Sequence, residues 1–161
     1  VVASVQGAAA GFGLSLMMAC DLVIAADSAF FTLAYINIGT SPDGSGTYFL
    51  PRVVGQKKAM EIALLGDRFD AATAKAMGLI NFIVPAAELE AETMKLATRL
   101  ATGPTRAIAN TKRLINHSLE RSLESQLQAE AMSFADCAAS EDWLEGVKAF
   151  AEKRRPAFKG R

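Results

Sequence analysis

The sequence predicts an α/β fold, with a strand-rich front part up to about Pro85 and a helical back half. Three apolar runs indicate buried strands, because they are rich in β-branched and aliphatic residues and end at polar or turn-forming residues. These runs are 1–5 ("VVASV"), 22–27 ("LVIAAD") and 79–85 ("LINFIVP"). Residues 87–155 are expected to be mainly helical. With 161 residues, 51% of them hydrophobic, the chain can bury a real core.

The segments between the first strands are expected to be a loop, a short helix and a turn. "GAAAGFG" (7–13) is a small-residue loop, and residues 14–21 then form one or two turns of buried helix. Residues 29–39 are apolar and are expected to be extended. "SPDG" (41–44) has the composition of a β-turn, because proline suits the second turn position and glycine follows.

Glycines, prolines and caps mark the helices of the front part. A short helix over 46–55 is expected to be broken by Pro51, and an amphipathic helix over 56–66 ends at its glycine. Asp70 is expected to cap a further helix that stops at Gly78.

The last helix of the back half is the most clearly marked. Breaks are expected near 102–105 and between Ala138 and Ser140. Ser140 is a good N-cap, the acidic pair 141–142 follows it, and the basic run 153–155 is expected in the last turn. Charges placed in this way oppose the helix dipole at both ends, and the next residue, a proline, stops the helix.

Composition argues against several classes of function. The formal net charge is zero, so no electrostatic grip on nucleic acid or an anionic membrane is expected. The longest apolar tract, 14–31, is interrupted by Asp21 and Asp27 and does not read as a membrane span. Cys20 and Cys137 form no disulfide framework, and a single histidine makes a metal site unexpected. A reducing compartment, the cytoplasm, is the expected location.

The chain starts with "VVASVQG", which reads as a strand already under way and lacks an initial methionine. We therefore expect further residues before Val1 in the natural protein. A targeting segment could lie on that part.

The glycine-rich segment 7–13 is the first candidate for chemistry. Glycines let the backbone approach a ligand closely, and the N–H groups at a helix start favour a negative oxygen. The spacing is not the G-x-G-x-x-G of dinucleotide binding, and the acid expected about 20 residues later would fall in an apolar stretch. The alternative interpretation is close packing of helix against strand.

Asp43 is the second candidate, because it is the one acidic residue in the uncharged, glycine-rich stretch 38–51. It could be a turn aspartate that hydrogen-bonds its own backbone. It could also be a base, since a carboxylate in an apolar pocket has a raised pKa. The apolar residues near it in sequence are Tyr35, Ile36, Ile38, Tyr48 and Phe49.

Two further segments could be functional, but each also has an ordinary interpretation as a solvent-exposed helix surface. His117 follows Lys112 and Arg113 on an amphipathic helix, where a solvated histidine is expected rather than a catalytic one. The basic segment "KAFAEKRR" (148–155) is either a solvated helix end or a phosphate-binding cluster in which Phe150 offers an aromatic face.

Taken together, the chain resembles the enoyl-CoA hydratase/isomerase (crotonase) superfamily over nearly its whole length. Four segments carry the resemblance in the same order as in that family: 1–31, 38–55, 63–85 and 140–160. The resemblance implies that an N-terminal part is absent here, which in the family supplies half of the oxyanion hole and much of the coenzyme A pocket.

The resemblance also implies a fold and an assembly. The fold is the family's spiral of ββα units, with 1–85 as the C-terminal portion of the acyl-CoA-binding core and 86–161 as a helical oligomerisation region. A homotrimer or a dimer of trimers is implied. No cofactor is bound permanently, and a coenzyme A thioester is the substrate.

Two backbone N–H groups hold the thioester oxygen in such enzymes as it becomes an enolate. The donor implied here is the N–H of Phe12, with Gly11 and Gly13 shaping the loop and the helix opening near Leu14 adding its dipole. Preorganised donors of this kind are worth about 3–4 kcal/mol of barrier each.

The acidic residues implied by the resemblance favour an isomerase. The two glutamates of the hydratases correspond to Ser15 and Tyr35, neither of which is a carboxylate. Asp43 falls where the isomerase branches carry their acidic base. "SPDGSGTYFLPR" (41–52) is most similar to enzymes that isomerise enoyl-CoA or 2-(oxepinyl)CoA in phenylacetate degradation. The dehalogenase branch has a nucleophilic aspartate at this place, but with tryptophan at position 35.

We therefore expect an enoyl-CoA isomerase with Asp43 as its base. Rival interpretations are another crotonase-type reaction (hydratase, dehalogenase or thioesterase) and a catalytically silent acyl-CoA-binding scaffold; a nucleic-acid module is a distant third. The residues implied in substrate contact are Leu33, Tyr35, Tyr48 and Phe49 for the acyl group and Phe150 and Lys153 for coenzyme A.

Overall fold

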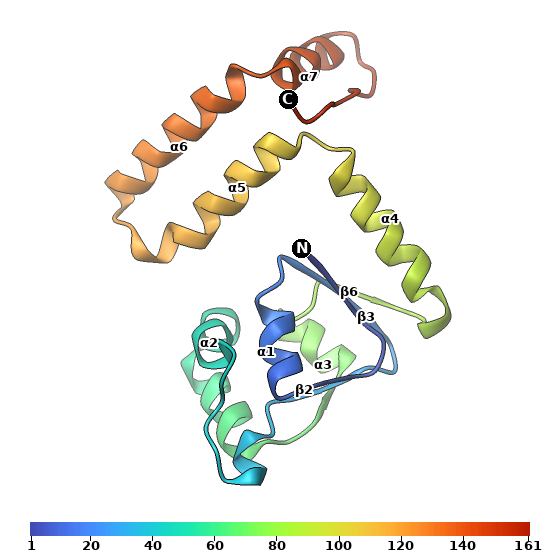
Figure 1. Ribbon diagram of the computed structural model, residues 1–161, viewed down its shortest axis with the longest axis vertical. Coiled ribbons are helices and arrows are strands. Elements are labelled where there is room, and N and C mark those ends of the chain that lie inside the picture. Colours follow the sequence, from blue (N-terminus) through green and yellow to red (C-terminus); the bar gives the residue numbers. More distant parts are fainter. The chain divides into compact units, whose positions relative to one another are not determined.

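The computed structural model describes residues 1–161, which form two compact units, Val1–Lys95 and Leu96–Arg161. The first unit holds all the strands together with helices α1, α2 and α3, and the second is entirely helical apart from its connections and tail (Figure 1). The predicted α/β class and the change from strands to helices along the chain are confirmed.

A parallel three-stranded sheet forms the first layer of the first unit. Its strands are β1 (Val2–Val5), β3 (Leu22–Ala26) and β6 (Phe82–Val84), in the order β1-β3-β6. Val2 pairs with Leu22, and Ile24 pairs with Phe82. All three strands lie within the predicted apolar runs, because strands with covered faces read as nearly continuous apolar sequence.

A second small sheet contains β2 (Ala8–Ala10), β4 (Phe30–Thr32) and β5 (Phe69–Asp70). β2 runs parallel to β4, and β5 runs antiparallel to it. The loop expected over 7–13 is therefore wrong for Ala8–Ala10, since pairing with β4 overrides the weak strand preference of alanine. The extended segment expected over 29–39 is right only for β4, because Tyr35–Ile38 form a 3-10 helix, η1.

Three α-helices lie wholly within the first unit: α1 (Phe12–Met18), α2 (Gly46–Leu65) and α3 (Ala71–Ala76). Asp70 caps α3 as expected, its side chain accepting a 2.8 Å hydrogen bond from the Thr73 N–H. The break expected at Pro51 is wrong.

The backbone of α2 leaves helical geometry at Gly55 instead, with φ 77° and ψ 160°. Glycine adopts this left-handed conformation without the steric penalty that a side chain would bring, so the chain bends there rather than at Pro51.

The core of the first unit joins α1, β4 and the first turns of α2. Its largest fully buried apolar side chains include Leu14, Phe31, Leu33 and Leu50. Burying a side chain of this size contributes about 1.5–3 kcal/mol. This packing fixes the start of α1 next to the segment that leads into α2, which is where the candidate site lies.

A short 3-10 turn, η2 (Ala86–Glu88), leads into α4 (Leu89–Ala101). The remaining elements are α5 (Thr105–His117), the 3-10 turn η3 (Ser118–Glu120), α6 (Leu123–Ala138) and α7 (Glu141–Ala151). The two predicted breaks are confirmed. A further break before α6 was not predicted, although Ser122 caps that helix by accepting a hydrogen bond from the Ser125 N–H.

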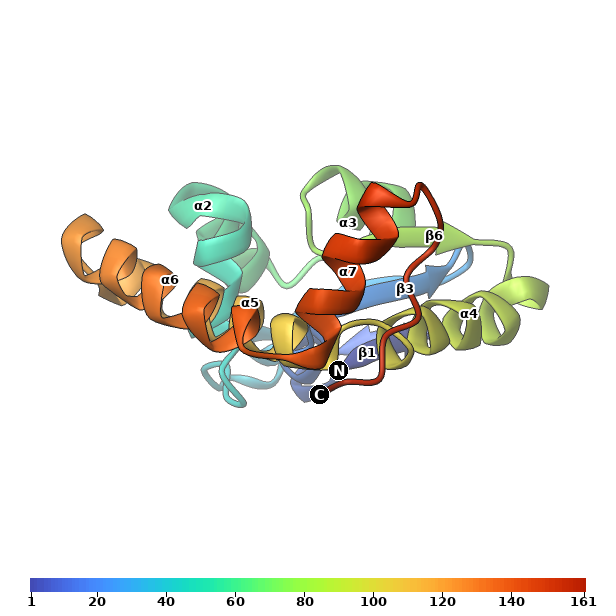
Figure 2. The same cartoon turned by 90° about the horizontal axis from the view of Figure 1, so that it is seen from above.

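The beginning of α7 was predicted correctly and its end was not. Ser140 accepts a 3.1 Å hydrogen bond from the Trp143 N–H, and an acidic pair occupies the first turn. The helix ends at Ala151, and Lys153 has a left-handed φ of 54°, so the basic run 153–155 lies beyond the helix rather than in its last turn. The chain then runs back along α7 (Figure 2). No helix of the structure combines the length and the apolar character needed to cross a membrane.

Candidate active site

The loop before α1 places backbone N–H groups at its start. Gly11 has φ 52° and ψ −120°, a conformation that favours glycine, and its N–H donates a 3.0 Å hydrogen bond to Thr32 in β4. The first hydrogen bond of the helix runs from the Ser15 N–H to the Gly11 carbonyl. The N–H of Phe12, at the first helical position, therefore has no acceptor within the helix.

Asp43 opens a tight turn that leads into α2. The Gly46 N–H donates a 3.2 Å hydrogen bond to the Asp43 carbonyl, and both central residues, Gly44 and Ser45, have left-handed φ values of 60° and 74°. Asp43 is thus the first residue of this turn. The turn predicted over 41–44 is therefore wrong by two positions. The chain reverses at Gly44 and Ser45, because these two residues have the left-handed backbone.

The turn packs directly against the first turn of α1. The fully buried Ser15 hydroxyl donates a 3.0 Å hydrogen bond to the Asp43 carbonyl. A Cβ atom on Gly44 would lie 2.6 Å from the Phe12 ring, so the ring rests on the bare backbone of the glycine. The Asp43 carboxylate and the Phe12 N–H, remote in sequence, are in this way held by the same contact between α1 and the turn.

Tyr35 adds a side-chain contact to this arrangement. Its hydroxyl donates a hydrogen bond to Oδ1 of Asp43. Its ring lies against Gly11, where an added Cβ would be 3.7 Å from two ring carbons. The hydrogen bond to the negative carboxylate, helped by desolvation, raises the pKa of the Tyr35 phenol above its usual value of 10.0.

The apolar surroundings expected for Asp43 are only partly formed by this chain. Asp43 itself is exposed, and Ile38 is 79% exposed. Ile36 packs instead near Gly66, where a Cβ would be 2.9 Å from its Cγ2. Proximity in sequence was misleading here, because η1 turns successive side chains in different directions.

The residues expected to contact the acyl group lie in different environments. Leu33 is fully buried in the core, next to Gly46. Tyr48 and Phe49 form an edge-to-face pair with ring centroids 5.1 Å apart, and the Arg52 guanidinium lies 3.6 Å from the Tyr48 ring centroid. Their role toward an acyl chain stays a prediction.

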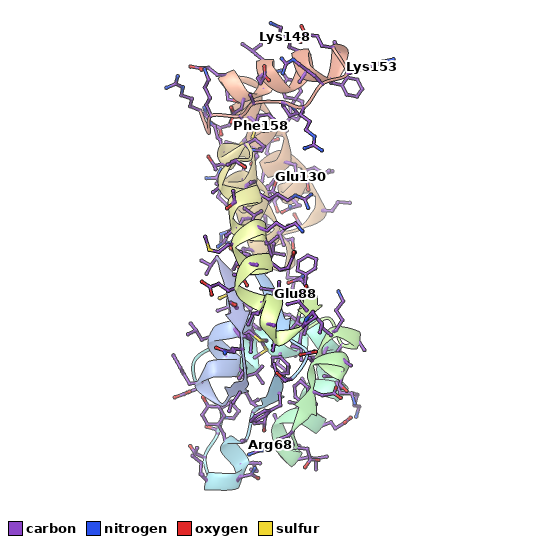
Figure 3. The ribbon with its side chains drawn as sticks, turned by 90° about the vertical axis from the view of Figure 1, so that its right-hand side faces the viewer. Arg68, Glu88, Glu130, Lys148, Lys153 and Phe158 are labelled. Atoms are coloured by element: carbon purple, nitrogen blue, oxygen red, sulfur yellow. The ribbon has the colours of Figure 1, made fainter.

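The residues expected to contact coenzyme A lie in the second unit. Phe150 is 87% exposed and, with Trp143 and Phe158, lines a hollow of about 340 Å³. Lys153 follows the end of α7, and Phe158 lies in the returning tail (Figure 3). The Lys153 N–H donates a 3.2 Å hydrogen bond to the Phe150 carbonyl, so the two positions are linked through the backbone. His117 is exposed at the end of α5, as expected for a solvated histidine.

Comparison with known proteins gives one consistent family. A sequence model described as enoyl-CoA hydratase/isomerase matches residues 1–161. A Rhodobacter capsulatus protein named as an enoyl-CoA hydratase is 45% identical over the whole chain, which covers 63% of that protein. The 1,2-epoxyphenylacetyl-CoA isomerase of Escherichia coli K12 is 40% identical over the whole chain, which covers 62% of its length.

Solved structures agree with this relationship. The crystal structure of an enoyl-CoA hydratase from Bacillus anthracis superposes with a TM-score of 0.94 at 36% identity, covering 100% of this chain and 62% of that one. An enoyl-CoA hydratase/isomerase from Cupriavidus metallidurans gives a TM-score of 0.94 at 32% identity, with 99% and 60% covered. The chain therefore spans about three-fifths of the length of these relatives.

Proposed function

This chain belongs to the enoyl-CoA hydratase/isomerase family, and we propose that its protein moves a double bond in an enoyl-CoA thioester, with Asp43 as the base. One observation carries the proposal: the turn that begins at Asp43 packs against the first turn of α1, where the Phe12 N–H lies. The carboxylate and the backbone donor that we propose therefore belong to two segments in direct contact.

The proposed reaction begins with a 3-enoyl-CoA. Its C2 carbon lies between the thioester carbonyl and the double bond, so the C2 proton is both α to the carbonyl and allylic. Asp43 accepts this proton, and the C2–H electron pair delocalises into the carbonyl to give a dienolate. Protonated Asp43 then returns the proton to C4, and the double bond settles between C2 and C3, giving the 2-enoyl-CoA.

The reaction places negative charge on the thioester oxygen, and this charge must be stabilised. Carboxylates are weak bases, with an ordinary pKa of about 3.9, so activation of the thioester must supply most of the acceleration. The Phe12 N–H is the donor that this chain offers to the enolate oxygen. Removing one such donor typically costs about 2.7–4 kcal/mol of barrier.

The side chains around Asp43 support isomerisation over hydration. Syn-hydration needs carboxylates to activate and deliver water, and the two positions implied by the family carry Ser15 and Tyr35. The Ser15 hydroxyl is buried and donates to the Asp43 carbonyl, while the Tyr35 hydroxyl donates to the Asp43 carboxylate. Hydration remains the second candidate, because most of the similar proteins are named as hydratases.

The proposal extends to binding and assembly. Leu33, Tyr35, Tyr48 and Phe49 are proposed for the acyl side, and Phe150 and Lys153 for coenzyme A. A trimer or dimer of trimers, built through the helical second unit, and a cytoplasmic location complete the proposal.

Product analysis on the full-length natural protein tests the reaction. The protein is incubated with 3-enoyl-CoA and, separately, with 2-enoyl-CoA thioesters, and double-bond migration and water addition are followed independently. We expect migration with little hydration. Hydration that is faster than migration would favour the second candidate, and coenzyme A binding without either reaction would favour a silent acyl-CoA-binding scaffold.

A further inference from the structure

Tyr35 comes from a third segment, η1, and its side chain contacts both halves of the candidate site. Its hydroxyl donates to Oδ1 of Asp43, on the turn before α2. Its ring lies against Gly11, the residue that sets the start of α1, with two ring carbons 3.7 Å from where a Cβ would be. A displacement of this side chain would therefore disturb the base and the oxyanion loop together.

The backbone holds Tyr35 firmly in this place. The Tyr35 N–H donates a 2.5 Å hydrogen bond to the carbonyl of Leu33, which is fully buried, and the Thr40 N–H donates to the Tyr35 carbonyl at 3.2 Å. Between Leu33 and Tyr35, Ala34 has a φ of 26°, a strained value for a residue with a side chain. Strain of this kind persists where the surroundings over-determine it, and it gathers at functional sites.

We propose that Tyr35 is a positioning residue. Its hydroxyl donates a hydrogen bond to Oδ1 of Asp43, so that Oδ2 faces the substrate and takes up and returns the proton. The proposal rests on the proposed function and adds to it. The structure shows the Tyr35 hydroxyl at Oδ1, one of the two carboxylate oxygens of Asp43. With its ring seated on Gly11, Tyr35 acts together with the Ser15 contact in setting the distance between the base and the Phe12 N–H.

The chemistry of the pair suits this role. A hydrogen bond from a phenol to a carboxylate is charge-assisted and stronger than one between neutral groups, so it suits the fixing of the Asp43 side chain. The same hydrogen bond raises the pKa of Tyr35, so the phenol keeps its proton, and hence its donor, throughout the neutral range.

An alternative role for Tyr35 is as a wall of the acyl pocket, and the two roles predict different kinetics. A pocket wall needs the ring, whereas a positioning residue needs the hydroxyl. Tyr35→Phe keeps the ring against Gly11 and removes only the hydroxyl. Tyr35→Leu removes both.

The test measures kcat and KM for isomerisation by the full-length protein. For Tyr35→Phe we expect kcat to fall by up to about 100-fold with KM nearly unchanged, as for a misplaced catalytic group. Tyr35→Leu is expected to raise KM as well. A Ser118→Ala variant, which loses an exposed hydroxyl in the second unit, serves as the control with unchanged rates. Thermal unfolding of each variant shows whether the fold is kept.

A double variant shows whether Tyr35 acts through Asp43. If it does, Tyr35→Phe combined with Asp43→Asn is no slower than Asp43→Asn alone. Full kcat in Tyr35→Phe, or additive losses in the double variant, would overturn the positioning role and leave the proposed function standing. Full activity in Asp43→Asn would instead defeat the proposed function itself.

An ultraviolet titration supplies a readout that does not depend on activity. The difference in tyrosinate absorbance between wild type and Tyr35→Phe reports the ionisation of Tyr35 alone. We expect it above pH 10.0 in the wild type, because the adjacent carboxylate opposes the loss of the phenol proton. In the Asp43→Asn background it should move to lower pH, and an unchanged midpoint would contradict the contact between the two side chains.

Discussion

The hydroxyl of Ser15 in α1 donates a 3.0 Å hydrogen bond to the backbone carbonyl of Asp43, 28 residues further along the chain. Ser15 is 0% exposed, and an added Cβ on Gly46 would lie only 2.6 Å from its Oγ. The contact therefore needs a small residue on each side. It fastens the turn that carries the carboxylate to the helix that presents the Phe12 N–H.

Replacing Ser15 by alanine should loosen this turn. The Asp43 carbonyl keeps its hydrogen bond from the Gly46 N–H, so the loss is one bond rather than an unpaired group. We expect the free energy of unfolding to fall by about 1 kcal/mol. We also expect kcat for isomerisation to fall while KM changes little. Denaturant unfolding and steady-state kinetics measure the two effects, and an unchanged kcat would show that the contact does not position the base.

Gly44→Ala should disturb the same turn from the opposite side. The residue has φ 60°, and the new methyl group would stand 2.6 Å from the Phe12 ring. The left-handed backbone alone costs about 1–2 kcal/mol for a non-glycine residue. We expect a loss of stability at least this large in denaturant unfolding, together with reduced activity.

Ser45→Gly is the matched control for this turn, because Ser45 already has a left-handed φ of 74°. Removing its side chain relieves strain, which offsets the extra flexibility of glycine in the unfolded chain. We expect little change in stability. A loss comparable to that of Gly44→Ala would mean that the strained turn is not formed as described.

Asp142 ties the C-terminal tail to the start of α7. It is only 5% exposed, and its two carboxylate oxygens accept hydrogen bonds of 2.7 Å from the Lys159 N–H and 2.9 Å from the Gly160 N–H. Asp142→Ala should cost about 1–3 kcal/mol of stability, because both donors lose their acceptor.

Hydrogen exchange at the amides of Lys159 and Gly160 measures this directly and should accelerate in Asp142→Ala. Glu141→Ala changes the adjacent residue, whose side chain is 62% exposed and pairs with Arg161. It is expected to leave those two amides protected. Equal exchange in wild type and Asp142→Ala would contradict the attachment of the tail.

The Arg106–Asp136 pair predicts part of the acid sensitivity of the second unit. The Arg106 guanidinium and the Asn110 amide donate to Asp136 and lower the pKa of its carboxyl from 3.8 to about 2. A lowered native pKa means that the contribution to stability is present above pH 3.8 and disappears as the pH falls toward 2. The slope of unfolding free energy against pH should therefore be smaller in Asp136→Asn over this range, and an equal slope would show that the pair is not formed.

Local signals account for the parts of the fold that the sequence predicted. The caps Asp70 and Ser140 act within three residues of themselves, and the strands β1, β3 and β6 lie in apolar runs whose composition predicts burial. The errors fall where distant contacts decide. β2 is a strand because it pairs with β4, and the basic run 153–155 lies beyond α7, where Arg154 pairs with Glu145, nine residues earlier.

The candidate site was predictable in its residues and not in its contacts. The acid in an uncharged turn and the family resemblance identify Asp43 and the Phe12 N–H. Spacing gave no signal for the hydrogen bond from Tyr35, because η1 and the strained Ala34 redirect that side chain. In the sequence, Ser15 was notable only because it stands where the hydratases have a glutamate. The structure shows that its hydroxyl donates a hydrogen bond to the Asp43 carbonyl.

The isomerisation rate of Asp43→Asn in the full-length protein tests the central claim most directly. Asparagine keeps the size of the side chain and the turn, and it cannot accept and return a proton. The account predicts that kcat falls by about 10²–10⁴-fold, the usual contribution of a general base. Asp67→Asn, at an exposed aspartate of the same unit, should keep the wild-type rate. A folded Asp43→Asn protein that isomerises at the wild-type rate would contradict the assignment of Asp43 as the base.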